Sequence, residues 1–186
     1  MARKRLVLAV AHGVSLALAM ALTPAFARAE VAVGADVSAV VPLGEQQTHV
    51  GFMTGLHGTY FWTFRALKIG PEIGFNYGAT NPVGDARKAL GGGYGGIRAT
   101  FELIPEITPY AYVHAGYGVA DARNLPDPNA REKFTSGALL DFTVGLARRV
   151  VPRLLIGLEA GYATIEPGKC FCARWVHVGV AANVSF

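Results

Sequence analysis

The chain has only two cysteines among its 186 residues, few charged residues (16%), and no long apolar run after its first thirty residues. A helix needs roughly 18 to 20 apolar residues in a row to cross a bilayer, so beyond that point any membrane integration must use β-strands. No cluster of lysine and arginine interleaved with aromatic residues occurs either. This absence argues against nucleic-acid binding.

The first 29 residues, by contrast, have the three parts of a secretory signal peptide. A basic start, MARKR, precedes an apolar stretch from Leu6 to Leu22, and small residues follow at Ala27 and Ala29. This order predicts export and cleavage before Glu30. An uncleaved membrane helix is the alternative, but the apolar stretch is short and contains a histidine, a glycine and a serine.

Removal of this segment changes the charge balance. The segment carries four basic residues and no acidic ones, so the net charge of +4 becomes 17 − 4 − 13 = 0 for residues 30–186. The basic character therefore belongs to the export signal. The remaining length suits a single domain.

Eight stretches of this domain alternate apolar residues with polar or small ones, the period expected of β-strands. Each is longer than most strands of globular proteins and long enough for a tilted strand to cross a bilayer. Their approximate ranges are 31–41, 49–62, 67–78, 92–103, 108–120, 136–148, 153–164 and 175–186.

The connections between these stretches alternate in length. The first, third, fifth and seventh are long and polar, whereas the second, fourth and sixth are short turns, TFRA, IPEI and RVVP. Outer-membrane barrels have short periplasmic turns and long extracellular loops. The sequence therefore predicts an all-β fold: an eight-stranded antiparallel up-and-down transmembrane β-barrel with both chain ends on the periplasmic side.

The two faces of each predicted strand indicate which one meets lipid. One face is apolar, as at Ile73, Phe75 and Tyr77, and the other is largely glycine with isolated charges. Glycine weakens strands and suits a water-facing surface poorly. It fits the narrow lumen of an eight-stranded barrel, so the apolar face is predicted to meet lipid. A soluble, lipocalin-like barrel with its apolar face inside is the alternative.

Aromatic residues gather near both ends of the predicted strands, as in the girdles of membrane barrels. Those near the periplasmic ends are Tyr60, Trp62, Phe64, Phe101, Tyr110 and Phe186, and those near the outer ends are Phe52, Phe75, Tyr77, Tyr117, Tyr162 and Trp175.

Three segments, ITPYAYVHAGYGVA, LLIGLEAGYAT and WVHVGVAANVSF, carry a family resemblance. The chain resembles the small outer-membrane β-barrels, such as the transmembrane domain of outer-membrane protein A, outer-membrane protein X and opacity-type proteins. The last segment is similar to the C-terminal signal that the barrel-insertion machinery recognises, with Val180, Ala182 and Val184 alternating up to Phe186. The resemblance implies a location in the bacterial outer membrane.

Ionisable residues on the glycine-rich face are expected to share the lumen. These are Asp36, Lys68, Glu72, Arg98, Glu102, Asp141, Glu159 and His177, with His57 and His114 nearby on the same register. One interpretation is that they line a polar pore or form a catalytic group. The other is that they pair with one another and plug the barrel, because burial of an unpaired charge is costly. The register of the stretch at 108–120 is ambiguous, so the sequence leaves open whether His114 faces the lumen or the outside.

Cys170 and Cys172 fall in the last long connection, EPGKCFCARW. In an exported protein an even pair of cysteines suggests a disulfide, although a ring this small is strained. A zinc site would need more ligands than this loop has. No metal and no cofactor is predicted.

The predicted function is that of a non-enzymatic integral outer-membrane protein with a structural or surface-interaction role through its long loops. Its expected partners are outer-membrane lipid, lipopolysaccharide phosphates, the insertion machinery and an extracellular ligand. A narrow passive channel and a lipid A-modifying hydrolase are the alternatives. Deacylases of the resembling family carry histidine and serine on one outward strand, whereas the same-face neighbours of His177 are Trp175 and Gly179.

Overall fold

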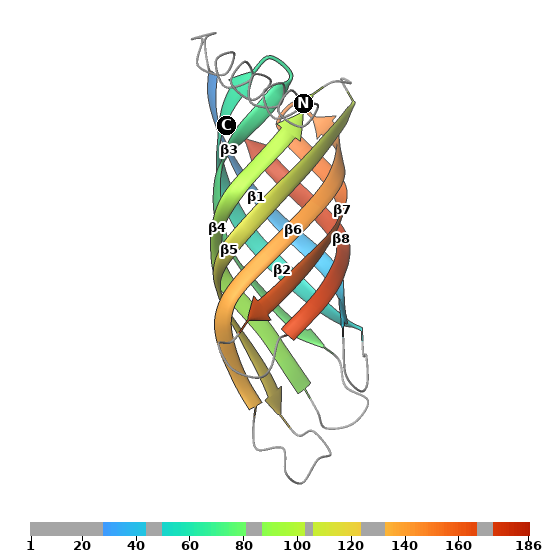
Figure 1. Ribbon diagram of the computed structural model, residues 1–186. Coiled ribbons are helices and arrows are strands. Elements are labelled where there is room, and N and C mark those ends of the chain that lie inside the picture. Colours follow the sequence, from blue (N-terminus) through green and yellow to red (C-terminus); the bar gives the residue numbers. More distant parts are fainter. Residues whose placement is uncertain (1–27, 44–49, 81–86, 103–105, 124–132, 167–172) are drawn as a thin grey trace, which may run out of the picture.

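A computed structural model describes residues 28–43, 50–80, 87–102, 106–123, 133–166 and 173–186. These residues form a closed antiparallel barrel in which each strand pairs with the next and β1 pairs with β8 (Figure 1). The predicted fold class is therefore confirmed. The strands are β1 (Arg28–Pro42), β2 (Gly51–Phe64), β3 (Leu67–Thr80), β4 (Arg87–Phe101), β5 (Ile107–Arg123), β6 (Lys133–Val151), β7 (Leu154–Glu166) and β8 (Ala173–Ser185).

The strand bounds separate two ends of the barrel. Two to five residues connect β2 to β3, β4 to β5 and β6 to β7, whereas the other four connections have six or more. We call these ends the short-turn end and the long-loop end. The first residues of β1 and the C-terminus both lie at the short-turn end, at the top of Figure 1. Short turns face the periplasm in outer-membrane barrels.

Three strands extend three or more residues further toward the long-loop end than the alternation of residues indicates. β4 begins at Arg87 rather than 92, β5 runs to Arg123, and β6 begins at Lys133 rather than 136. The backbone ladder continues there, with Arg87 opposite Arg123 and Ala122 opposite Lys133. Ladder hydrogen bonds do not depend on side-chain polarity, so the apolar pattern ends before the strands do.

The outside of the barrel is apolar and the inside is polar. Ile73 and Leu158, for example, are 70% and 67% exposed, whereas Glu72 between outward neighbours is 1% exposed. A soluble barrel has the opposite arrangement, so the lipocalin-like alternative is wrong. A closed sheet with an apolar outer belt satisfies its backbone internally and can cross a bilayer. Among the described residues no helix is long and apolar enough to span a membrane.

Glycine on the inner face makes room for polar side chains. A Cβ atom added at Gly34 would overlap His57 Nε2 and Asn183 Oδ1, and one at Gly161 would overlap Thr143 Oγ1. On the outer face, a Cβ atom at Gly93 would meet nothing within 4 Å. Inner-face glycine is therefore a packing requirement of the narrow lumen.

Two aromatic residues that the sequence placed in the girdles point into the lumen instead. Tyr110 and Trp175 are 7% and 2% exposed, respectively. Each occupies an inner-face position of its strand, and the strict alternation of side chains overrides its distance from the strand end. At the short-turn end, Tyr60 and Trp62 do face outward and pack edge to face, with ring centroids 5.4 Å apart.

Candidate functional site: a filled lumen

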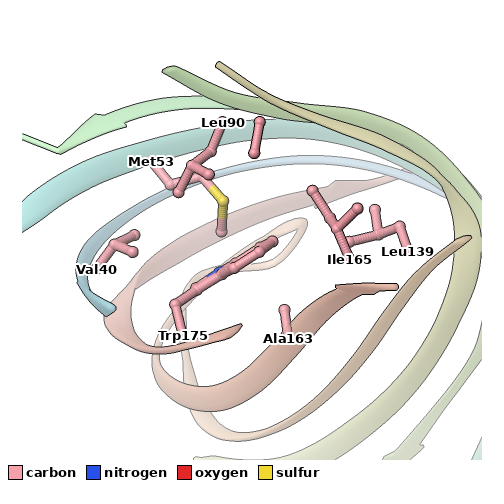
Figure 2. Close-up of a cluster of buried hydrophobic side chains, with 8 residues drawn as sticks. Val40, Met53, Leu90, Leu139, Ala163, Ile165 and Trp175 are labelled. Atoms are coloured by element: carbon pink, nitrogen blue, oxygen red, sulfur yellow. The ribbon is translucent and has the colours of Figure 1, made fainter. Parts of the chain in front are cut away.

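Toward the long-loop end the lumen contains a group of buried apolar side chains, which we call the apolar cluster. Its members are Val40, Met53, Leu90, Ala120, Leu139, Ala163, Ile165 and Trp175. Figure 2 shows the indole of Trp175 lying across the lumen, with the sulfur of Met53 pointing toward it. Lumens of membrane barrels are usually polar, so this cluster is a departure from the common pattern.

Next to the apolar cluster, on its short-turn side, lies a network of charged and polar groups, which we call the central cluster. Glu72 lies at its middle. Arg98 Nε lies 3.0 Å from Glu72 Oε2, and His114 Nε2 lies 2.8 Å from Glu72 Oε1. The hydroxyl of Thr59 donates to Glu72 Oε2 at 2.5 Å. Side chains from three different strands therefore contact one buried carboxylate, two through hydrogen bonds and one through an ion pair, which stabilises its charge.

His57 occupies one side of this cluster. Its Nε2 lies 2.8 Å from Asn183 Oδ1, and its Nδ1 lies 3.8 Å from Asp36 Oδ1. Arg98 also donates to Asn183 Oδ1, at 3.0 Å. These contacts connect β1, β2, β4 and β8 across the lumen.

The other side of the cluster is built by β5, β6, β7 and β8. Thr143 donates to Asp141 Oδ1 at 3.1 Å, and His177 Nε2 lies 3.0 Å from the same hydroxyl. Glu159 accepts a hydrogen bond from the hydroxyl of Tyr110 at 3.0 Å. All five side chains are buried.

Aromatic rings enclose the centre of the network. His114 stacks on Tyr94 and on Tyr112, with ring centroids 4.2 and 4.3 Å apart. The guanidinium of Arg98 lies 5.0 Å from the ring centroid of Tyr110 and 4.9 Å from that of Tyr112. These rings cover the ion pairs on the sides that they face, and the low local dielectric there strengthens the pairs.

The short-turn end has a more open arrangement, the mouth. Lys68 Nζ lies 2.6 Å from Glu30 Oε2 and 3.1 Å from Glu102 Oε1, and Arg149 reaches Glu102 at 2.8 Å. A cavity of about 30 Å³ lies behind them, lined among others by Arg98, Asn183 and Ser185. This space suffices for about two water molecules.

The structure separates the predicted lumen residues into two groups. Lys68 and Glu102 lie at the mouth. The other six belong to the central cluster: Asp36, Glu72, Arg98, Asp141, Glu159 and His177. His114, whose side the sequence left open, faces inward and is 1% exposed.

Sequence reasoning missed the uncharged members of the lumen. Thr59, Thr143 and Asn183 hydrogen-bond to its charges, and Tyr94 and Tyr112 stack on His114. Each lies an even number of residues from a predicted inward charge on its strand or from His57 or His114, so the same alternation would have found them. In the part of the chain that the structure describes, no three histidine, cysteine, aspartate or glutamate side chains are placed to hold a metal ion.

Comparison of the fold with solved structures gives a consistent set of neighbours. Neisserial surface protein A aligns with a TM-score of 0.61 and 15% identity, over 84% of this chain and 97% of its own. The outer membrane enzyme PagL aligns at 0.54 and 13%, over 80% and 98%. Ail, the attachment invasion locus protein of Yersinia pestis, aligns at 0.52 and 15%, over 86% and 99%.

This chain has the fold of the small eight-stranded outer-membrane β-barrels. The resemblance noted in the sequence is thus confirmed at the level of fold. No protein-family model and no curated protein matches the sequence. Small transmembrane β-barrels lie in outer membranes, and the apolar outer belt agrees with that, so the protein is placed in the bacterial outer membrane.

A nucleophile beside a base would mark a hydrolytic site on the outer surface of the barrel. His57, His114 and His177, the histidines that the structure describes, are all buried in the lumen. An exposed hydrogen bond joins the hydroxyls of Tyr117 and Ser136 at 2.8 Å, without a base beside it. The described outer face therefore lacks the histidine that activates a serine. Cys170, Cys172 and residues 1–27 of the predicted signal peptide lie outside the described residues, whereas the last two residues of that peptide, Arg28 and Ala29, begin β1.

Proposed function

We propose that this protein is a closed, non-enzymatic barrel, held in the outer membrane, with a structural or surface-interaction role. The observation that carries the proposal is the filled lumen. The apolar cluster occupies its long-loop half and the central cluster occupies its middle. With the inside filled and the outside apolar, the two ends of the barrel remain for a partner, and the long-loop end has the longer connections.

A narrow passive channel is the first competing function. Ions need a continuous wet path, and apolar constrictions exclude water. Trp175, Leu139 and Ile165, each at most 2% exposed, favour a closed barrel. Single-channel recording of the refolded protein in planar bilayers tests this, and we expect no current above background. Discrete, reproducible conductance steps would contradict the proposal.

A lipid-modifying enzyme is the second competing function, because PagL is named an outer membrane enzyme and has a similar fold. The described outer face offers no histidine to serve as the base. Incubation of the refolded barrel with lipid A, followed by mass spectrometry, is the test. We expect unchanged lipid A, whereas a deacylated product would overturn the non-enzymatic assignment.

We further propose lipopolysaccharide and an extracellular ligand as partners at the long-loop end. The long connections carry charges of both signs, as in GDARKAL, and can meet phosphate groups. Ail, a structural neighbour, has been solved with the heparin analogue sucrose octasulfate. We expect the unfolding temperature in vesicles to rise when lipopolysaccharide is added to phosphatidylcholine. An unchanged temperature would argue against this contact.

The barrel-insertion machinery is the proposed partner of the last strand. Val180 and Val184 face outward, and Phe186 is 71% exposed at the end of the chain. We expect Phe186→Ala to slow assembly in cells while leaving spontaneous refolding into detergent unchanged. Equal assembly of the variant and the wild type would remove this proposal.

A further inference from the structure

The middle of the lumen has an imbalance of charge. Its described acidic and permanently basic side chains are Asp36, Glu72, Asp141 and Glu159 against Arg98 alone. Four carboxylates against one guanidinium leave three negative charges, and the histidines of the central cluster are the other groups that can become positive. Burial of unpaired charge is strongly unfavourable, so protons are expected to supply part of the balance.

His114 is the histidine with the most demanding surroundings. Its Nε2 lies 2.8 Å from Glu72 Oε1, and its Nδ1 lies 3.6 Å from Asp141 Oδ2. Its ring is sandwiched between Tyr94 and Tyr112 and is 1% exposed. The imidazole therefore faces a carboxylate oxygen at each nitrogen, in a site that bulk water does not reach.

Neither neutral tautomer of His114 fits these contacts. A neutral imidazole has one N–H and one lone pair, so one nitrogen would direct its lone pair at a carboxylate oxygen. Both carboxylates already accept other hydrogen bonds, Glu72 from Thr59 and Asp141 from Thr143. An imidazolium, in contrast, directs an N–H at both carboxylates.

We propose that His114 and Asp141, next to Glu72, form a proton-binding site that holds one proton in the folded barrel at neutral pH. The proton adds to Nδ1, the nitrogen that faces Asp141, while Nε2 keeps its hydrogen toward Glu72. This proposal concerns the inside of the barrel and does not rest on the proposed surface role.

Among the described residues, the cavity at the short-turn end offers the proton a route to the site. The cavity behind the mouth is lined by Arg98, which lies 3.0 Å from Glu72, and Glu72 contacts His114. On the other side, the apolar cluster separates the site from the long-loop end. The charge state of the lumen is therefore expected to follow the pH of the periplasm.

Every strand packed around the site contributes to its electrostatics. The charged and titratable groups facing it are Glu72 on β3, Arg98 and Tyr94 on β4, Tyr112 on β5, and Asp141 on β6. His57 pairs with Asp36, 3.8 Å away, on the far side of Arg98. His177 reaches Asp141 only through Thr143.

His177 is the matched control. The hydroxyl of Thr143 donates to Asp141, so its oxygen accepts from His177 Nε2. The Nδ1 atoms of His177 and His114 both lack a hydrogen-bond partner in the described structure, but that of His114 faces Asp141 Oδ2 at 3.6 Å, whereas no such contact is seen for His177. A neutral imidazole satisfies these contacts, and no bound proton is required. The two histidines thus have similar burial, but His114 is expected to be positively charged and His177 neutral.

The test is the urea-unfolding equilibrium of the refolded barrel in phosphatidylcholine vesicles between pH 6 and pH 8.5. The unfolded chain releases the histidine proton above about pH 6.5, so the folded state binds more protons and loses stability as pH rises. We expect the unfolding constant to rise up to about tenfold per pH unit above pH 7. His114→Gln should lose this slope, and His177→Gln should keep it.

A spectroscopic measurement on the wild type covers the case in which His114→Gln does not fold. The ¹⁵N shifts of the His114 ring at pH 7 should show both nitrogens protonated. A neutral ring, or a His114→Gln variant with the wild-type pH slope, would overturn the proposal. So would stability at pH 8 that depends on sodium or potassium concentration but not on pH, because an alkali cation would then balance the charge.

Discussion

Toward the long-loop end, the apolar cluster fills the lumen with aliphatic side chains and with Met53 and Trp175. In the middle of the barrel, ion pairs that involve Glu72, Arg98 and His114 fill it instead. The side chains of both regions are buried, but different interactions hold them in place. Dispersion and burial hold the first, and each side chain there contributes separately. In the second, each group depends on its partners, because a buried charge without a partner is costly.

One barrel thus combines an apolar plug with a group of charged side chains whose protonation depends on pH. The apolar cluster contains no titratable group, so its packing should not depend on pH. The central cluster lies on the side of the apolar cluster that the mouth and its cavity reach. Substitutions of similar size in the two halves should therefore have unequal effects.

The largest effect is expected for Glu72→Ala in the central cluster. The change leaves Arg98 and His114 without their shared carboxylate and should lower the free energy of unfolding by about 3–5 kcal/mol. Urea unfolding of the refolded barrel in vesicles measures it. A loss below about 1 kcal/mol would show that the network contributes little.

A smaller effect is expected for Leu139→Ala in the apolar cluster. Leu139 is 1% exposed, and its truncation removes contacts but strands no charge. The free energy of unfolding should fall by about 2–3 kcal/mol, the lower part of the usual range for a buried leucine. The same urea titration compares the two halves directly, and a larger loss than for Glu72→Ala would reverse the comparison.

A still smaller effect is expected for Gly161→Ala on the inner face. The added Cβ atom would overlap the hydroxyl of Thr143, so His177 and Thr143 must move, at about 1–2 kcal/mol. Gly93→Ala on the outer face is the control, because nothing lies within 4 Å of its added Cβ atom. Equal stability of the two variants would show that lumen space does not limit the sequence.

The smallest effect is expected for Arg148→Ala at the short-turn end. Arg148 pairs with Glu106 at 3.2 Å, but both side chains are more than 70% exposed. Exposed pairs contribute less than about 1 kcal/mol, and added salt should remove even that difference. A loss comparable to that of Glu72→Ala would mean that burial does not determine how much an ion pair contributes to the free energy of unfolding in this protein.

The alternation of residues predicted the barrel and the side on which most charges lie. Glu72 and Glu159, for example, lie on the glycine-rich face of their strands in the sequence, and both are buried in the lumen. The apolar cluster was not predicted, because Trp175 and Leu139 stand at inner-face positions among polar neighbours near strand ends. An aromatic or aliphatic residue near a strand end can fill the lumen or belong to the outer girdle, and the residue type alone does not distinguish the two positions.

The partners within the lumen were beyond the sequence for a geometric reason. Glu72 and His114 are 42 positions apart, and Arg98 meets Asn183 across the barrel. Alternation predicts which face of a strand a side chain occupies. It does not predict the stagger between distant strands, and this stagger determines which side chains come into contact. The split of the charges between mouth and centre also follows from that stagger.

The most direct test of the account is the stability of Leu158→Arg, since Leu158 faces outward in the middle of β7. If hydrocarbon covers this face, the arginine should lower the free energy of unfolding in phosphatidylcholine vesicles by about 2–4 kcal/mol. A variant that folds into vesicles as stably as the wild type would mean that water, not lipid, covers the apolar belt.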